Sequence, residues 1–178
     1  MNDFYDLVMR RESCHDFLET PVEQEKLNKI IEIARLSPSA CNSQPWSFVV
    51  ANKPEVCSKI APCLQDCGLN KFSENCPAFI IVIEEKVNFK TIIGGVTHNQ
   101  YYAPIDLGIA TAHICLAASD LGLSTCIMGW LNESKLKKLL SINQTKRIRL
   151  VIGVGYAATE EIHEKKRKSF DEIVRYIK

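Results

Sequence analysis

The feature that most constrains the fold is a pair of short apolar runs, one near the middle of the chain and one near its end. Residues 78–83 read AFIIVI, and residues 149–156 read RLVIGVGY. Short apolar runs rich in β-branched residues are typical of buried strands. Residues 46–51 predict another buried strand, and residues 124–128 a fourth strand. Because helical patterns lie between these runs, the chain belongs to the α+β or α/β class.

Capping signals mark where several helices should begin. A first helix is predicted over residues 3–10. In the second, Thr20 is expected to cap, Pro21 to take the first helical position and Glu23 to complete a capping box, with an end before Pro38. Further helices are predicted over residues 55–64, 105–121, 132–140 (capped by Asn132) and 169–176, the last with a capping box from Ser169 to Glu172. Residues 86–104 are less regular, and they predict either a loop or a segment that covers another part of the protein.

The helix predicted over residues 105–121 is apolar nearly all round, which indicates burial in the protein centre or at an interface. Asp106, His113 and Asp120 exclude a lipid-facing span. The acidic, polar start of the chain lacks the pattern of a secretory signal. With 178 residues and no dividing linker, we expect one domain over residues 1–178.

Charge and cysteine content narrow the class of protein. The net charge of +1 gives no global field for nucleic acid or an anionic membrane, so neither is expected as a partner. The eight cysteines include no Cys-x-x-Cys pair, the nearest being Cys63-x-x-x-Cys67. We therefore favour reduced, structural thiols in a cytoplasmic protein over a metal or cluster site, which stays the alternative. The four histidines show no paired-ligand spacing.

Three polar segments stand out against the apolar core. Residues 10–15 (RRESCH) and the basic run at residues 165–168 could hold a phosphate by charge-assisted hydrogen bonds, although each alone is also what a solvated surface segment looks like. Residues 37–46 (SPSACNSQPW) combine small side chains with Asn42 and Gln44, whose amides suit the edge of a heterocycle. Together the segments indicate one phosphorylated aromatic ligand.

These segments, in this order, resemble the nitroreductase family of FMN enzymes. The family pattern Arg-x-Ser-x-Arg/Lys corresponds to residues 11–15 (RESCH), and Pro-Ser-Ser/Ala-x-Asn-x-Gln-Pro-Trp to residues 38–46. The buried Asp-x-Gly-x-Ala helix, the Leu-Gly-Leu that follows it and a Gly-containing strand end are found at residues 106–110, 121–123 and 128–130. The final Gly-Tyr strand and Lys-x-Arg correspond to residues 155–156 and 165–167. The proline–tryptophan block is the most specific of these motifs.

The resemblance implies a fold and a set of cofactor contacts. The fold is a three-layer α+β arrangement with a central mixed, mainly antiparallel sheet flanked by helices, and FMN at the interface of a homodimer. Arg11, Ser13, His15, Lys165 and Arg167 are implied to hold the FMN phosphate, with Arg10 beside them. The other implied FMN contacts are Pro38, Ser39, Ala40, Asn42 and Gln44, the first four from the partner subunit, together with Asn70, Met128 and Gly129. His15 stands where relatives carry a permanent cation.

The resemblance also implies the chemistry. FMN carries the redox reaction, so no protein residue is expected to be a catalytic acid, base or nucleophile. NADH or NADPH would reduce small organic acceptors, such as nitroaromatics or quinones, by a ping-pong hydride-transfer mechanism. The alternatives are a flavin-binding carrier or sensor without turnover and a relative that fragments flavin or removes halogen. A Gly-x-Gly-x-x-Ala match at residues 153–158 is rejected as a dinucleotide site, because too little chain follows for a βαβ unit.

Overall fold

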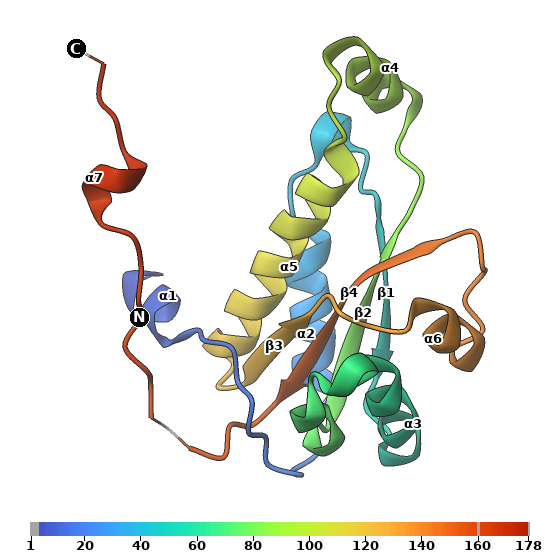
Figure 1. Cartoon of the computed structure of the whole chain (residues 1–178), viewed down its shortest axis with the longest axis vertical. Helices are drawn as coiled ribbons and strands as arrows, with labels where there is room; N and C mark the ends of the chain where they lie inside the picture. The colour runs from blue at the N-terminus through green and yellow to red at the C-terminus, as the bar shows by residue number, and fades with distance from the viewer. Residues whose placement is uncertain (1–3, 160, 178) are drawn as a thin grey trace.

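The computed structural model describes residues 4–159 and 161–177, and a four-stranded antiparallel sheet forms its centre (Figure 1). The strands are β1 (Trp46–Ala51), β2 (Ala78–Glu84), β3 (Ser124–Met128) and β4 (Arg147–Gly155), in the order β1-β2-β4-β3. The predicted sheet was mixed, but every strand pair described is antiparallel, and the parallel element is an isolated bridge between Ser13 and Thr125.

Helices cover both faces of this sheet. Alternate side chains of β2 point to opposite faces, so Ile80 and Val82 pack under α2 (Gln24–Arg35) and α5 (Tyr102–Asp120). Phe79, Ile81 and Ile83 pack on the other face, which α3 (Pro54–Leu64) and α6 (Glu133–Leu139) cover. The predicted α+β three-layer architecture is therefore confirmed.

The remaining elements lie around the rim of these layers. The short helix α1 (Phe4–Arg10) contacts α5, and α4 (Phe89–His98) lies beyond the N-terminal end of α5 (Figure 1). The part of the chain that the structure describes also contains three 3-10 turns: η1 (Ala40–Asn42), η2 (Asp66–Gly68) and η3 (Lys71–Asn75). The chain ends in an extended tail that carries α7 (Phe170–Ile173) and runs away from the sheet (Figure 1). None of the described helices is long and apolar enough to cross a membrane.

Local sequence signals located most elements, and two capping predictions are confirmed. Asn132 accepts a hydrogen bond from the Lys135 amide at the start of α6. Ser169 and Glu172 form the predicted capping box, although α7 ends at Ile173 rather than at Tyr176, since the chain turns extended at Val174. The predicted buried strand over residues 46–51 exists as β1, but it lies at an edge of the sheet and is only half-buried.

Two other predictions were wrong. Thr20 does not cap α2, which begins at Gln24 with Glu23 at the cap position. The Glu23 carboxylate instead accepts a hydrogen bond from the Tyr156 hydroxyl, so it does not close a capping box. The segment 86–104 is largely helical rather than irregular, because Asn88 caps α4 by accepting from the Thr91 amide, and α5 begins already at Tyr102. An N-cap of this kind is a local signal for the start of a helix, and the spacing of apolar residues alone does not reveal it.

The glycines of β4 serve packing, which explains the rejected dinucleotide motif. A Cβ on Gly155 would lie 2.7 Å from the Pro77 Cδ and 2.9 Å from the Phe17 Cδ1. A Cβ on Gly153 would lie 2.8 Å from the Cys76 Sγ. Both positions are buried within a strand, so neither opens a phosphate-binding turn.

We predict that Gly155→Ala lowers the free energy of unfolding by about 1–3 kcal/mol, because the Pro77 ring cannot move aside from the added methyl group. Equilibrium urea denaturation measures the change. Gly129→Ala is the matched control, since its Cβ would meet only the Leu150 Cδ2 at an ordinary 3.6 Å. Equal stability of the two variants would contradict the packing explanation.

Candidate functional site

The two basic segments of the sequence meet in one cleft of about 470 Å³. One wall is the segment that follows α1, with Arg11, Ser13 and His15. The other is the tail segment, with Lys165 and Arg167. All five residues predicted to bind phosphate thus line the same cleft, although the two segments are separated by most of the chain. Permanent cations outnumber carboxylates there, four (Arg11, Lys165, Lys166 and Arg167) to two (Glu12 and Glu164).

Backbone pairing fixes the first wall of this cleft. The Cys14 amide donates to the Thr125 carbonyl of β3 at 2.9 Å. Further along, the Leu18 amide donates to the Tyr156 carbonyl at 2.9 Å, and the Ala158 amide to the Asp16 carbonyl at 2.9 Å. The segment therefore crosses between the edge strand β3 and the chain that leaves β4. This explains why a polar stretch without regular structure holds a defined position.

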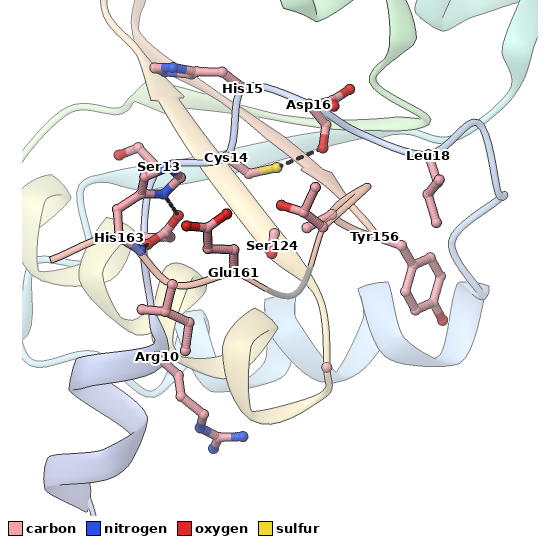
Figure 2. A pocket seen from close by; sticks show the side chains of 15 residues that line it. Arg10, Ser13, Cys14, His15, Asp16, Leu18, Ser124, Tyr156, Glu161 and His163 are labelled. Carbon is pink, nitrogen blue, oxygen red and sulfur yellow. Dashed lines mark hydrogen bonds and ion pairs between the residues drawn. The ribbon is translucent and has the colours of Figure 1, made fainter.

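The ammonium of Lys165 indicates what the cleft is built to hold. Its Nζ is buried and has no hydrogen-bond partner among the described residues. A buried charge without a partner is costly, so this arrangement fits a site completed by an anion. The Nε and Nη2 of Arg10 are also buried without a hydrogen-bond partner among the described residues, but Arg10 lines a second cavity of about 630 Å³ (Figure 2). This cavity adjoins the basic cleft, since both are lined by Ser13 and His163.

The side chains between these cations have their own contacts. The His15 ring packs against Phe72 of η3, with ring centroids 4.6 Å apart. Glu12 accepts hydrogen bonds from the His163 backbone amide and from its Nδ1, each at 3.0 Å (Figure 2). The hydrogen bond from His163 is the main cause that lowers the pKa of Glu12, and the same bond raises the pKa of His163.

The amide-rich loop at residues 38–44 lies elsewhere and has unusual backbone geometry. Cys41, Asn42 and Gln44 have positive φ angles of 51°, 51° and 48°. Non-glycine residues rarely adopt this region, and a cluster of them is typical of functional loops. The loop also bonds to itself: the Gln44 amide donates to the Ser39 hydroxyl at 2.9 Å, and the Gln44 Nε2 to the Asn42 Oδ1 at 3.1 Å. Ser39 and Ala40 are half-buried, whereas Pro38, Asn42 and Gln44 are exposed.

Two helices hold this loop in place. The Ala40 amide donates to the Oδ1 of Asp106, a buried residue in the first turns of α5, at 3.1 Å. From α4, the Asn88 Nδ2 donates to the Cys41 carbonyl at 2.9 Å, and the Thr91 hydroxyl donates to the Ala40 carbonyl at 3.1 Å. The strained backbone is therefore fixed from both sides.

The length of α5 separates the loop from the basic cleft. Asp106 holds the loop near the start of this helix, whereas Gly122, just after its end, lines the larger cavity together with Ser13. The fourteen residue steps from Asp106 to Asp120 span roughly 21 Å at about 1.5 Å per step. One chain thus does not bring the two predicted halves of the binding site together.

The end of β3 carries the remaining predicted contacts. Met128 is buried and Gly129 is exposed directly after the strand. The strand extends roughly 13 Å from Thr125, beside the basic cleft, to Gly129, which suits an elongated ligand. Asn70 lies nearby, but its Nδ2 already donates to the Leu64 carbonyl at 3.0 Å and the Trp130 carbonyl at 3.3 Å. Its Oδ1 is the atom left for the predicted contact.

The eight cysteines are free thiols in the described structure, and six of them are buried. Burial raises the pKa of Cys76 to about 12, and burial raises the pKa of Cys57 and of Cys126 to about 11. These thiols stay protonated at neutral pH and behave as small core side chains. Among the described residues, no three acidic, histidine or cysteine side chains gather as possible metal ligands.

Sequence reasoning missed several residues that shape the site. Asp106 was recognised as part of a motif, but its bond to the loop could not be inferred from the motif. Asn88 and Thr91 carried a weak signal, since an Asn three residues before a Thr can start a helix. Glu12 and His163 carried none, because 151 positions separate them in the sequence.

Comparison with known proteins gives consistent matches over nearly the whole chain. Residues 8–71 and 64–156 match the model of the nitroreductase family. The oxygen-insensitive NADPH nitroreductase of Helicobacter acinonychis is 29% identical, over 96% of this chain and 95% of that protein. Iodotyrosine deiodinase 1 of Rattus norvegicus is 23% identical, over 97% of this chain and 68% of the deiodinase. The structure of a nitroreductase family protein from Streptococcus pneumoniae superposes with a TM-score of 0.83, covering 98% of this chain and all of the other, at 24% identity.

We predict that Asp106→Ala releases the loop, while Asp106→Asn does not, because an asparagine oxygen can still accept from the Ala40 amide. Loss of a partly buried hydrogen bond should lower the free energy of unfolding by about 1–3 kcal/mol. Hydrogen exchange should show faster exchange of the Ala40 amide in Asp106→Ala than in Asp106→Asn. Indistinguishable exchange in the two variants would show that Asp106 does not hold the loop.

Proposed function

The chain belongs to the nitroreductase family, and we propose that it is an FMN-dependent oxidoreductase that uses NADH or NADPH to reduce small organic acceptors. The observation that carries this proposal is the basic cleft, in which Arg11, Ser13, His15 and Arg167 lie with the buried ammonium of Lys165, which has no hydrogen-bond partner among the described residues. A phosphate monoester supplies the acceptor oxygens and negative charge that such a set lacks.

The protein's own groups bind and orient the cofactor. Arg11 and Arg167 offer forked donors to the phosphate, Ser13 a hydroxyl and Lys165 a compact charge. The strand β3 then leads to Met128 and Gly129, where an exposed glycine allows a flat ring to approach the backbone. Asn70 offers its Oδ1 to the ring edge. Arg10, which faces the adjoining cavity, adds positive potential beside the phosphate rather than a direct contact.

Bound FMN would supply the redox chemistry, taking a hydride from the nicotinamide and passing reducing equivalents to the acceptor. No side chain of this protein is needed as acid, base or nucleophile. The two substrates would use the same face in turn, which gives ping-pong kinetics. The free thiols fit the reducing cytoplasm that we propose as its location.

We infer a homodimer that completes two shared sites. The residues Pro38, Ser39, Ala40, Asn42 and Gln44 are held at the far end of α5 from the cleft, so they could contact only a cofactor bound by a partner subunit. An exposed stripe on α5 consists of Ile105, Gly108 and Ala112: Gly108 and Ala112 are small enough to permit close helix contact, and Ile105 adds a large exposed apolar side chain. Exposed Phe4, Val8 and Met9 on α1 add apolar surface of the kind that marks interfaces.

The surface of α4 favours neutral acceptors. This helix is bonded to the loop at residues 40–43, and its exposed side chains include Phe89, Ile92, Ile93 and Val96. No carboxylate occurs from residue 86 to residue 105. A nitroaromatic or quinone can pack against such a surface, whereas the ammonium of a free amino acid finds no partner on it.

Reductive dehalogenation is the second candidate, supported by the similarity to iodotyrosine deiodinases over 97% of the chain. A visible spectrum and anaerobic titration with NADH and NADPH test for a reducible flavin. Turnover with a quinone, a nitroaromatic and iodotyrosine then separates the reactions, and we expect the first two to be reduced faster. Reduction of the flavin without turnover of any acceptor would favour the carrier or sensor instead.

We predict that Arg11→Ala and Arg167→Ala each weaken FMN binding by about 1.5–3 kcal/mol, the range for hydrogen bonds to charged groups. Riboflavin, which lacks the phosphate, should bind poorly and respond little to either change. Fluorescence titration gives both affinities. An equal loss of riboflavin affinity would place the two arginines away from the phosphate.

We predict that Ala112→Glu dissociates the dimer and with it lowers FMN affinity, because a charge would be buried in the α5 stripe. An obligate interface of more than roughly 2,000 Å² tolerates no such group at its centre. The control is Ser58→Glu, an equal change at an exposed position of α3 on the opposite face of the sheet. Sedimentation should show a dimer for wild type and the control; a stable FMN-loaded monomer of wild type would refute the shared site.

A further inference from the structure

Glu12 is an acidic residue in the middle of a segment that otherwise suits an anion. It lies between Arg11 and Ser13, and it lines the same basic cleft. A carboxylate there repels a phosphate, so its direct electrostatic effect on the proposed cofactor is unfavourable. For Glu12 to favour cofactor binding, its contacts must therefore stabilise the binding site by more than this repulsion costs.

Those contacts join the two walls of the cleft. The Glu12 Oε2 accepts from the His163 backbone amide, and the Glu12 Oε1 accepts from the His163 Nδ1, both at 3.0 Å. His163 precedes Lys165 by only two residues. Hydrogen bonds further along the tail, such as those from the Arg167 Nη1 to the Lys166 carbonyl and from the Ser169 amide to the Glu172 carboxylate, join residues of the tail to one another. Because the Glu12 carboxylate accepts from both the backbone and the side chain of His163, it fixes the position and the orientation of the chain at that residue.

We propose that Glu12 and His163 form a clasp that holds the tail against the first wall and so positions Lys165 and Arg167 for the phosphate. Both are positioning residues, since neither needs to touch the cofactor. The inference rests on the proposed function, because it assigns the phosphate of FMN to this cleft. The His163 side chain is 77% exposed and that of Glu12 26%, so the clasp can open in solution.

The clasp also links cofactor binding to pH. The hydrogen bond to Glu12 raises the pKa of His163. The stability that protonated His163 adds to the clasp is therefore present at low pH and declines as pH rises through the raised pKa. The pKa of Glu12 is lowered, so its contribution is lost only as pH falls through that lowered value. Besides Glu12, the charged and titratable groups that line the two cavities with His163 in the described structure come from three parts of the chain: Arg10 from α1; Arg11, Cys14, His15 and Asp16 from the first wall; and Tyr156, Glu161, Glu164, Lys165, Lys166 and Arg167 from the chain after β4. Of these, Glu161 reinforces the raised pKa of His163.

The decisive experiment compares Glu12→Gln with Glu164→Gln in the full-length protein. Each removes one negative charge from the same cleft, so electrostatics alone predicts equal or tighter FMN binding by both. The clasp predicts that Glu12→Gln weakens FMN binding by about threefold to tenfold, the worth of one net hydrogen bond, while Glu164→Gln does not weaken it. Riboflavin affinity should be unchanged in both. FMN binding by Glu12→Gln that equals or exceeds wild type overturns the clasp.

Two readouts keep the test independent of turnover. In protein without added cofactor, hydrogen exchange of the His163 amide should be faster in Glu12→Gln than in wild type or Glu164→Gln. His163→Gln retains a side-chain donor without titrating, so its FMN affinity should decline less toward alkaline pH than that of wild type. Parallel pH profiles, or unchanged exchange at His163, contradict the proposal. If wild type binds no FMN, the proposed function fails, and the exchange measurement still decides whether the clasp exists.

Discussion

The rest of the structure depends on the burial of β2 and β4 on both faces. Ile80 and Val82 on one side, and Phe79 and Ile81 on the other, are all fully or almost fully excluded from solvent. Each apolar face must be covered, and a strand pair flanked by edge strands leaves helices as the only cover. This requirement places α2 and α5 in one layer and α3 and α6 in the other. The functional segments are then confined to the rim of the sheet and the ends of α5.

In the homodimer that we propose, that arrangement links cofactor binding to association. The helix α5 lies between the loop held by Asp106 and the cleft that contains Ser13, so its own length keeps them apart. A second copy packed against the same helix can supply what the first cannot reach. Because the predicted contacts divide between the two ends of one rigid element, loss of the dimer should remove half of each site without unfolding either chain.

The electrostatics of the cleft have a consequence for stability. The buried ammonium of Lys165 has no hydrogen-bond partner among the described residues, and such a group favours a state in which an anion reaches it. A ligand that binds only the folded protein raises its stability by RT ln(1 + L/Kd), where L is the free ligand concentration, so the gain keeps growing as L rises above Kd. The tail that carries Lys165 is otherwise exposed, so the bound phosphate would order the end of the chain as well as hold the cofactor.

The sequence by itself determined the elements and the chemistry of the segments. Apolar runs such as AFIIVI and caps such as Asn132 and Ser169 are local signals, since they depend on neighbours within a few residues. The motif residues Arg11 and Arg167 indicated a phosphate because the chemistry of a guanidinium side chain does not depend on the fold. The capping box predicted from Thr20 to Glu23 does not form. Glu23 instead accepts a hydrogen bond from Tyr156, a residue far away in the sequence.

Only the tertiary structure decided which segments meet. It brought residues 11–15 and 165–167 into one cleft, while it kept the loop around Ala40 at the other end of α5. It also joined Glu12 to His163, a contact between positions with no periodicity or motif in common. Such pairings follow from the register of β3 and β4 and from the direction of the chain after Tyr156. These are global properties, since they arise when the whole core packs, and no short window of sequence contains them.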